Sequence, residues 1–200
     1  MTDTERLRKD IIDFLEEESF MIPDSLVLMI DAEYADERQL LEIADELRFK
    51  MKRIKYISSL ICIVLIVIYG IHLALVYNTL PQMVADHYDF AGNPDSYGNR
   101  IGLVMEPLIS IMIVVIMDLV SNFPDLWNYP VKVTEENREF LYKVTLLMVS
   151  ILKIIVTALL LYMGLCSMYS FLPPTVIYVF VILLLTVCFG SIFIMWRGSK

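Results

Sequence analysis

Apolar residues along the chain gather in four long stretches separated by short polar segments. Windows of about 20 residues, the helix length that crosses about 30 Å of hydrocarbon, place them at about 55–78, 101–120, 144–168 and 172–196. Because lipid offers the backbone no hydrogen-bond partners, each stretch is expected to be a helix, and the lack of alternating polarity excludes a barrel. The pattern predicts an all-α integral membrane protein with a four-transmembrane-helix bundle over residues 55–200.

Residues 1–54 show a different pattern, in which apolar positions recur at helical spacing among charged ones. One helix is expected after a cap at Asp3 or Thr4, with a break near Pro23. A second is expected from about Asp36, and it can continue unbroken into the first span. The apolar positions of the first helix are Leu7, Ile11, Phe14 and Leu15. This segment either packs on itself or on the bundle, or it offers a surface to a partner protein.

Composition supports this division of the chain. Of 200 residues, 58% are hydrophobic and 20% charged, which is too apolar for a soluble globule or a disordered chain. The net charge of -8 argues against a nucleic-acid partner. Residues 1–50 hold 15 acidic and 6 basic side chains, whereas residues 51–200 hold 9 and 10. The acidity therefore belongs to the N-terminal segment.

Basic residues indicate how the spans are oriented. They cluster from Arg48 to Lys55, in the connection 121–143 and in the C-terminal tail, whereas the connection 79–100 carries only Arg100. Since basic loops stay in the cytoplasm, both termini are expected inside a bacterial cell membrane. No positively charged start precedes an apolar core and cleavage site, so the first span is expected to act as an uncleaved anchor.

The outer loop, residues 79–100, is rich in turn formers, acids and aromatic residues. Pro81 favours an extended entry, Gly92 can adopt a positive φ, and Pro94 with its neighbours favours a turn. A loop of this length and apolar content is expected to fold down on the outer mouth of the bundle. Its candidate ligand-binding residues are Leu80, Pro81, His87, Asp89, Gly92, Pro94, Asp95, Gly98 and Arg100.

This loop closely resembles the signature Leu-Pro...His...Gly-x-Pro-Asp-x-x-Gly-x-Lys of the domain of unknown function 1648, found in the SdpI-like family of bacterial membrane immunity proteins. Arg100 stands where lysine is usual, and Ala85 replaces a common proline. An inner-loop stretch also looks like the segment that follows in SdpI-like proteins. It contains Asn128, Tyr129, Pro130, Glu136 and Asn137. The resemblance covers about residues 78–140.

The resemblance implies a function as well as an architecture. The best-known SdpI-like protein confers immunity to a secreted peptide toxin and also senses it, holding a transcriptional repressor at the membrane. The expected partners are therefore the lipid bilayer, a secreted peptide outside and a regulatory protein inside. The alternative is a small transporter or envelope protein with a polar intramembrane site. No enzyme motif or cofactor motif is present, and nothing in the pattern specifies an oligomeric state.

Two further sets of residues carry chemistry. His87 with Asp86 and Asp89 could form part of a metal site, although a histidine bonded within its own loop is the alternative. Glu106 and Lys153 lie within predicted spans, where a charge costs about 2.5 to 3.5 kcal/mol unless it is partnered. We expect them to face the bundle interior, and either to pair directly or to line one polar cavity. Such an arrangement is either a structural clasp or a functional site.

Three alternatives are purely structural. Asp95 can bond its own turn, Arg100 can anchor the boundary of the membrane, and Thr134 can start a helix with the acids that follow it. Docking of a cytoplasmic protein is the alternative role for the inner loop. The cysteines fall within spans without metal-ligand spacing and are expected to pack in the bundle. They are Cys62, Cys166 and Cys188.

Overall fold

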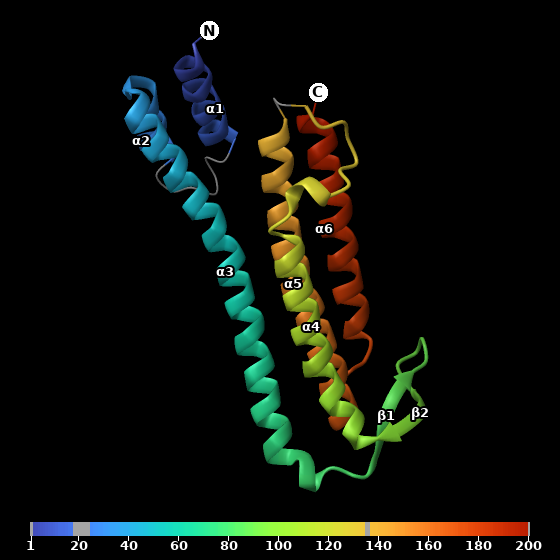
Figure 1. Ribbon diagram of the computed structural model, residues 1–200. Coiled ribbons are helices and arrows are strands. Elements are labelled where there is room, and N and C mark those ends of the chain that lie inside the picture. The colour runs from blue at the N-terminus through green and yellow to red at the C-terminus, as the bar shows by residue number, and fades with distance from the viewer. Residues whose placement is uncertain (1, 18–24, 135–136, 200) are drawn as a thin grey trace. The chain divides into compact units, whose positions relative to one another are not determined.

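The computed structural model describes residues 2–17, 25–134 and 137–199, which form two compact units, Met1–Arg53 and Ile54–Lys200 (Figure 1). The first unit holds α1 (Asp3–Glu17), α2 (Ser25–Tyr34) and the beginning of α3 (Glu37–Val76). The second holds the remainder of α3 and every later element. The helix that the sequence predicts from about Asp36 does continue into the first span as one helix.

The first unit is a small helical assembly with its own core. Thr2, rather than Asp3 or Thr4, caps α1, since its hydroxyl accepts the Glu5 amide at 3.2 Å while Glu5 accepts the Thr2 amide. Asp36 and Gln39 exchange bonds in the same way at the start of α3. The predicted break at Pro23 and the side chain of Phe14 lie outside the described part of the structure. The buried core residues are Ile11, Leu15, Leu28, Ala32, Ala35, Leu40 and Ile43.

Among the described residues, four helices are long and apolar enough to cross a membrane, which confirms the predicted fold class. They cover Arg53–Thr79, Arg100–Val120, Arg138–Met168 and Val176–Gly198. The last three contain α4 (Met105–Val120), α5 (Arg138–Met168) and α6 (Val176–Gly198). The last span starts four residues later than predicted. Pro173 and Pro174 remain in the loop, where their carbonyls accept the first amides of α6.

The second unit is built around a core between α3, α4 and α5. Tyr69 on α3 lies so close to Gly164 on α5 that a methyl group at position 164 would overlap the tyrosine hydroxyl. That hydroxyl donates to the carbonyl of Leu103 at 3.2 Å, just before α4. The missing side chain at Gly164 thus leaves the room that the Tyr69 ring occupies between the helices. The three cysteines are free thiols, and Cys62 and Cys166 are buried.

The outer loop contains a β-hairpin that the sequence did not predict. Strands β1 (Met83–Tyr88) and β2 (Pro94–Asn99) pair antiparallel, with Val84 opposite Gly98 and Ala85 opposite Tyr97. The short helices η1 (Tyr77–Thr79) and η2 (Arg100–Val104) flank the hairpin. Gly92 in the turn has φ 85°, as its predicted role requires. Val84 and Ala85, two of the apolar residues of this loop, are buried.

Candidate functional site

Arg100 fastens the base of the hairpin to the end of α3. Its Nη1 donates to the carbonyls of Leu80 at 2.7 Å and Tyr77 at 3.0 Å, and the guanidinium lies 4.6 Å from the centre of the Tyr77 ring. Its amide also donates to the Gln82 carbonyl at 2.9 Å. Charge-assisted bonds to two carbonyls at a helix end are strong positioning contacts. Arg100 therefore holds the loop in place, which is more than anchoring at the membrane boundary.

Asp89 organises the tip of the hairpin. One carboxylate oxygen accepts the amides of Asn93 at 2.8 Å and Ala91 at 2.9 Å. The Asn93 backbone and side-chain bonds hold the pKa of Asp89 below its ordinary value. The tip itself is fastened to the last span, because the Tyr178 hydroxyl donates to the Phe90 carbonyl at 2.8 Å. The tight turn thus falls between Asp89 and Asn93, ahead of the predicted Asn93-Pro94-Asp95 turn.

His87 pairs with Asp95 across the hairpin, with Nδ1 and Oδ1 2.5 Å apart. The hydrogen bond and charge of Asp95 raise the pKa of His87. Asp86 lies against Gly98, where any β-carbon would collide with its carboxylate. Over the residues that the structure describes, no group of three or more metal-ligating side chains is brought together. In the described structure His87 pairs with Asp95, while Asp89 bonds the backbone of the hairpin tip.

The hairpin also carries an exposed apolar face. Met83 is two residues from Ala85, the cross-strand neighbour of Tyr97, so the Met83 and Tyr97 side chains lie on one face. Both are largely exposed, whereas Leu80 and Val84 are buried below the hairpin. Among the predicted loop residues, Leu80 thus supports the hairpin, while Pro81, Pro94 and Asp95 remain at its surface.

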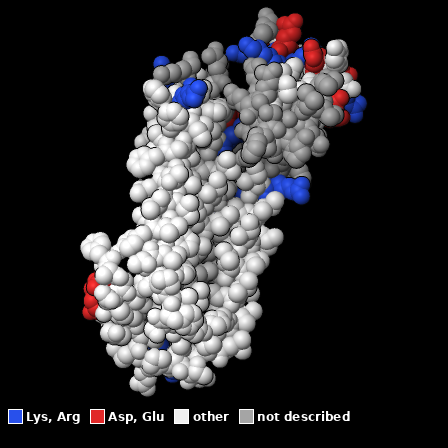
Figure 2. All heavy atoms as spheres, turned by 180° about the vertical axis from the view of Figure 1, so that it is seen from behind, with Lys and Arg blue, Asp and Glu red and all other residues white. Residues whose placement is uncertain are grey.

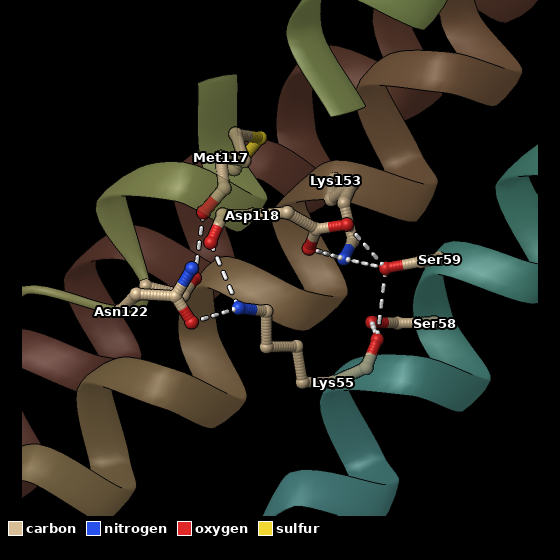
Figure 3. Close-up of polar contacts among 8 residues, drawn as sticks. Lys55, Ser58, Ser59, Met117, Asp118, Asn122 and Lys153 are labelled. Atoms are coloured by element: carbon tan, nitrogen blue, oxygen red, sulfur yellow. Dashed lines mark hydrogen bonds and ion pairs between the residues drawn. The ribbon is translucent and has the colours of Figure 1, made fainter. Parts of the chain in front are cut away.

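A polar cluster joins α3, α4 and α5 at the opposite end of the bundle (Figure 3). Lys153 Nζ donates to Asp118 Oδ1 and to Ser59 Oγ, both at 2.7 Å. Ser59 in turn donates to the other Asp118 oxygen at 2.7 Å. The Lys153 side chain is 1% exposed and that of Asp118 29% exposed. A closed ring of three bonds thus satisfies a buried cation within the predicted membrane span.

Lys55 extends this cluster toward the end of α4. Its ammonium donates to the Asp118 carbonyl at 2.8 Å and to Asn122 Oδ1 at 2.7 Å. A cation at the carboxyl end of a helix is stabilised by the helix dipole. Lys55 therefore binds the backbone at the end of α4, and Lys153 binds the Asp118 carboxylate on the same turn.

The predicted direct pair between Glu106 and Lys153 is wrong. Asp118, which the sequence analysis did not single out, takes the place of Glu106, which lies twelve residues earlier on the same helix. Twelve residues correspond to about 18 Å, which is beyond the reach of a lysine side chain. Within the described part of the chain, Glu106 Oε2 is buried and has no hydrogen-bond partner. Glu106 instead lies near Tyr69, remote from the polar cluster.

Two spacings could have pointed to the cluster. Lys55 and Ser59 are four residues apart on one helix, which puts them on one face, and Asn122 follows Asp118 by four residues, just past the end of α4. Both pairs lie at the same end of their spans. In the sequence, however, Lys55 belongs to the basic segment that flanks the first predicted span, and Asp118 lies near the end of the second.

The inner-loop residues have mainly structural roles. Asn137 Oδ1 accepts the Thr134 amide at 2.8 Å, and its Nδ2 donates to the Lys132 carbonyl at 3.0 Å. Trp127 stacks on Tyr142 of α5 with ring centres 5.5 Å apart, and Tyr129 lies 6.1 Å from the same indole. Asn128 and Pro130 are exposed at the surface, and Glu136 lies outside the described residues.

One comparison with known proteins gives a match. Residues 64–111 match the family model described as "Domain of unknown function (DUF1648)". The match runs from the second half of the first span through the hairpin to the start of α4. No curated protein and no solved structure matches the chain. The four spans and this match together support a multi-pass integral membrane protein with a DUF1648-like outer segment.

Proposed function

We propose that this protein recognises a secreted antimicrobial peptide or toxin through its hairpin, and thereby confers immunity or senses the peptide. The observation that carries the proposal is an exposed Met83–Tyr97 face on a hairpin that is fastened to the bundle at both its base and its tip. An apolar surface held in a fixed position loses little conformational entropy when it binds a ligand. It is therefore suited to capture of an amphipathic peptide.

Charge on the hairpin favours a cationic peptide. Asp86, Asp89 and Asp95 are all exposed, and Figure 2 shows acidic side chains at the hairpin on an otherwise nearly uncharged face of the helices. His87 and Arg100 are the basic groups of the loop, and Arg100 is engaged with backbone carbonyls. A field of one sign attracts ligands of the other and raises their rate of association.

The proposed location is the bacterial cell membrane, with both termini in the cytoplasm and the hairpin outside. The distribution of basic residues supports this orientation. The cytoplasmic side then carries the acidic N-terminal unit and the inner loop. Either one is a candidate docking surface for a regulatory protein, which would account for a sensing role.

Expression in a toxin-sensitive bacterium tests the proposal. Cells that produce the full chain should survive a panel of secreted antimicrobial peptides better than cells carrying a variant in which residues 83–99 are replaced by a Gly-Ser segment of equal length. Both proteins should be present in the membrane in equal amounts. Equal killing across the panel would contradict the proposal.

Lys153 favours a second candidate, a small transporter with a polar intramembrane site. Ionisable side chains within membrane spans often mark the path of a transported ion or solute. The double variant Lys153→Met with Asp118→Leu distinguishes the two candidates, since it removes both charges and retains apolar packing. A transporter should lose its activity in this variant, whereas a hairpin receptor should still protect the cell.

A further inference from the structure

The tip of the hairpin is held against the start of α6. Besides the bond from Tyr178 to Phe90, a β-carbon at Gly92 would lie 3.3 Å from Thr175 Cγ2 and 3.7 Å from Pro174 Cδ. Thr175 and Pro174 immediately precede the last span. The tip therefore lies at the same depth as the first turn of a membrane helix.

The start of α6 lies at a level before the end of α5, that is, closer to the middle of the bundle. The Tyr162 hydroxyl donates to the Pro173 carbonyl at 3.0 Å, and Tyr162 lies six residues before the end of α5. Six residues correspond to about 9 Å along a helix. Since α5 itself is expected to span the bilayer, the start of α6 and the hairpin tip lie well within its length. Figure 1 shows the hairpin rising from its base beside the lower end of α6.

Two large aromatic side chains near this depth are uncovered. Phe90 at the tip is 92% exposed, and Phe171 in the neighbouring loop is 79% exposed. The apolar window of α6 has no residue buried inside the protein, so its surface is available to lipid. The exposed aromatic rings therefore lie next to a lipid-facing helix, near its end. Aromatic side chains of membrane proteins gather at this level, the membrane–water interface.

Four backbone amides of the tip have hydrogen-bond partners within the loop and therefore do not need water. The amides of Ala91 and Asn93 are bonded to the Asp89 carboxylate, the Gly92 amide to the Asp89 carbonyl, and the Asp89 amide to the Asn93 carbonyl. Non-helical backbone is tolerated at membrane depth only where its polar groups are satisfied. A loop that is surrounded by bulk water has no such requirement.

We infer that the hairpin tip inserts into the interfacial layer of the leaflet on its own side of the membrane, with the Phe90 ring as its lipid anchor. The partner of this surface is the bilayer, and the inference does not depend on peptide recognition. A further consequence does rest on the proposed function. The hairpin would then meet its ligand at the membrane surface, so the ligand class would be peptides already partitioned into the leaflet.

Depth-dependent fluorescence quenching tests the inference. Two full-length variants, Phe90→Trp and Gln82→Trp, are placed in a background with Trp127→Phe and Trp196→Phe, and each is reconstituted in phosphatidylcholine vesicles with or without brominated acyl chains. Gln82 is the matched control, because it is exposed at the base of the same hairpin. Circular dichroism and gel filtration establish that both variants are folded.

The expected result is that brominated lipid quenches the Phe90→Trp emission severalfold more strongly than the Gln82→Trp emission, and that acrylamide in the buffer gives the reverse order. Equal quenching at the two positions, or freer access of acrylamide to position 90, would overturn the inference. No peptide is present in this measurement. Its failure is therefore distinct from failure of the survival assay, which replaces the whole hairpin.

Discussion

Lys153 on α5 and Asp118 on α4 form an ion pair at 2.7 Å within the bundle, and Ser59 on α3 bonds to both of them. The cost of placing a charge in a membrane span is thus offset by a carboxylate and a hydroxyl from two other helices. The same contact fixes the end of α4 against α3 and α5.

Asp118→Asn should destabilise the bundle by about 3–5 kcal/mol, because it leaves the ammonium of Lys153 buried without a countercharge. The amide keeps the size of the side chain and can still bond to Ser59. Thermal unfolding in detergent, followed by circular dichroism, measures the effect as a lower Tm than that of the wild type.

The double variant Lys153→Met with Asp118→Leu is the control for that prediction. Removing both charges should restore most of the lost stability, since buried ion pairs are often replaced by apolar side chains at little cost. If the double variant were as unstable as Asp118→Asn, the destabilisation would come from altered packing, and the unpaired charge would not explain it.

Gly164→Ala should separate α5 from α3. The added methyl group overlaps the Tyr69 hydroxyl, so either the helices move apart or the tyrosine loses its bond to Leu103. Overpacking of this kind costs about 1–3 kcal/mol. Gly190→Ala on α6 is the matched control, because nothing lies within 4 Å of its added β-carbon. Equal unfolding temperatures for the two variants would contradict the close α3–α5 packing.

Arg100→Ala should loosen the hairpin without unfolding the helices. It removes two hydrogen bonds to a charged group, each worth about 1.5–3 kcal/mol. Arg100→Lys, which introduces the residue usual in the resembling family, keeps the charge but not the planar guanidinium. Hydrogen exchange measured by mass spectrometry should show the fastest exchange over residues 83–99 in Arg100→Ala and an intermediate rate in Arg100→Lys. Unchanged exchange in both variants would be inconsistent with the fastening role.

The His87–Asp95 pair should make the hairpin sensitive to pH. Because pairing raises the pKa of His87, its stabilising contribution is complete below the ordinary histidine value of 6.5 and is lost as pH rises through the raised value. The chain has two histidines, so two imidazole signals can be followed by NMR in nanodiscs. Asp95→Asn should lower the pKa of His87, because it removes the charge that raises it. An identical His87 titration in both proteins would show that the pair is absent.

The helices could be predicted from the sequence because the bilayer constrains them strongly. A run such as that between Tyr56 and Tyr77, free of charged residues, has few solutions other than a spanning helix. The hairpin could not be predicted, since its base is held by bonds from Arg100 to carbonyls about twenty residues earlier, and its tip by Tyr178 of the last span. Local turn residues alone did not specify it.

For a related reason, only one member of the polar cluster, Lys153, could be predicted from the sequence. The cost of a buried charge shows that Lys153 needs a partner, but the choice of partner depends on the tilt and rotation of the helices. Asp118 lies near the end of its predicted span, where an acid is ordinary, whereas Glu106 lies deeper in that span, where an unpaired charge costs more. Packing brings Lys153 to the former.

The central claim, that the hairpin face recognises a secreted peptide, is tested most directly by survival of sensitive cells that produce single variants. Tyr97→Ser removes an exposed aromatic ring from the hairpin, and Leu126→Ser removes an even more exposed apolar side chain from the inner loop. With matched membrane levels, protection should fall in Tyr97→Ser and persist in Leu126→Ser. Full protection by Tyr97→Ser, or equal loss in both variants, would contradict the claim.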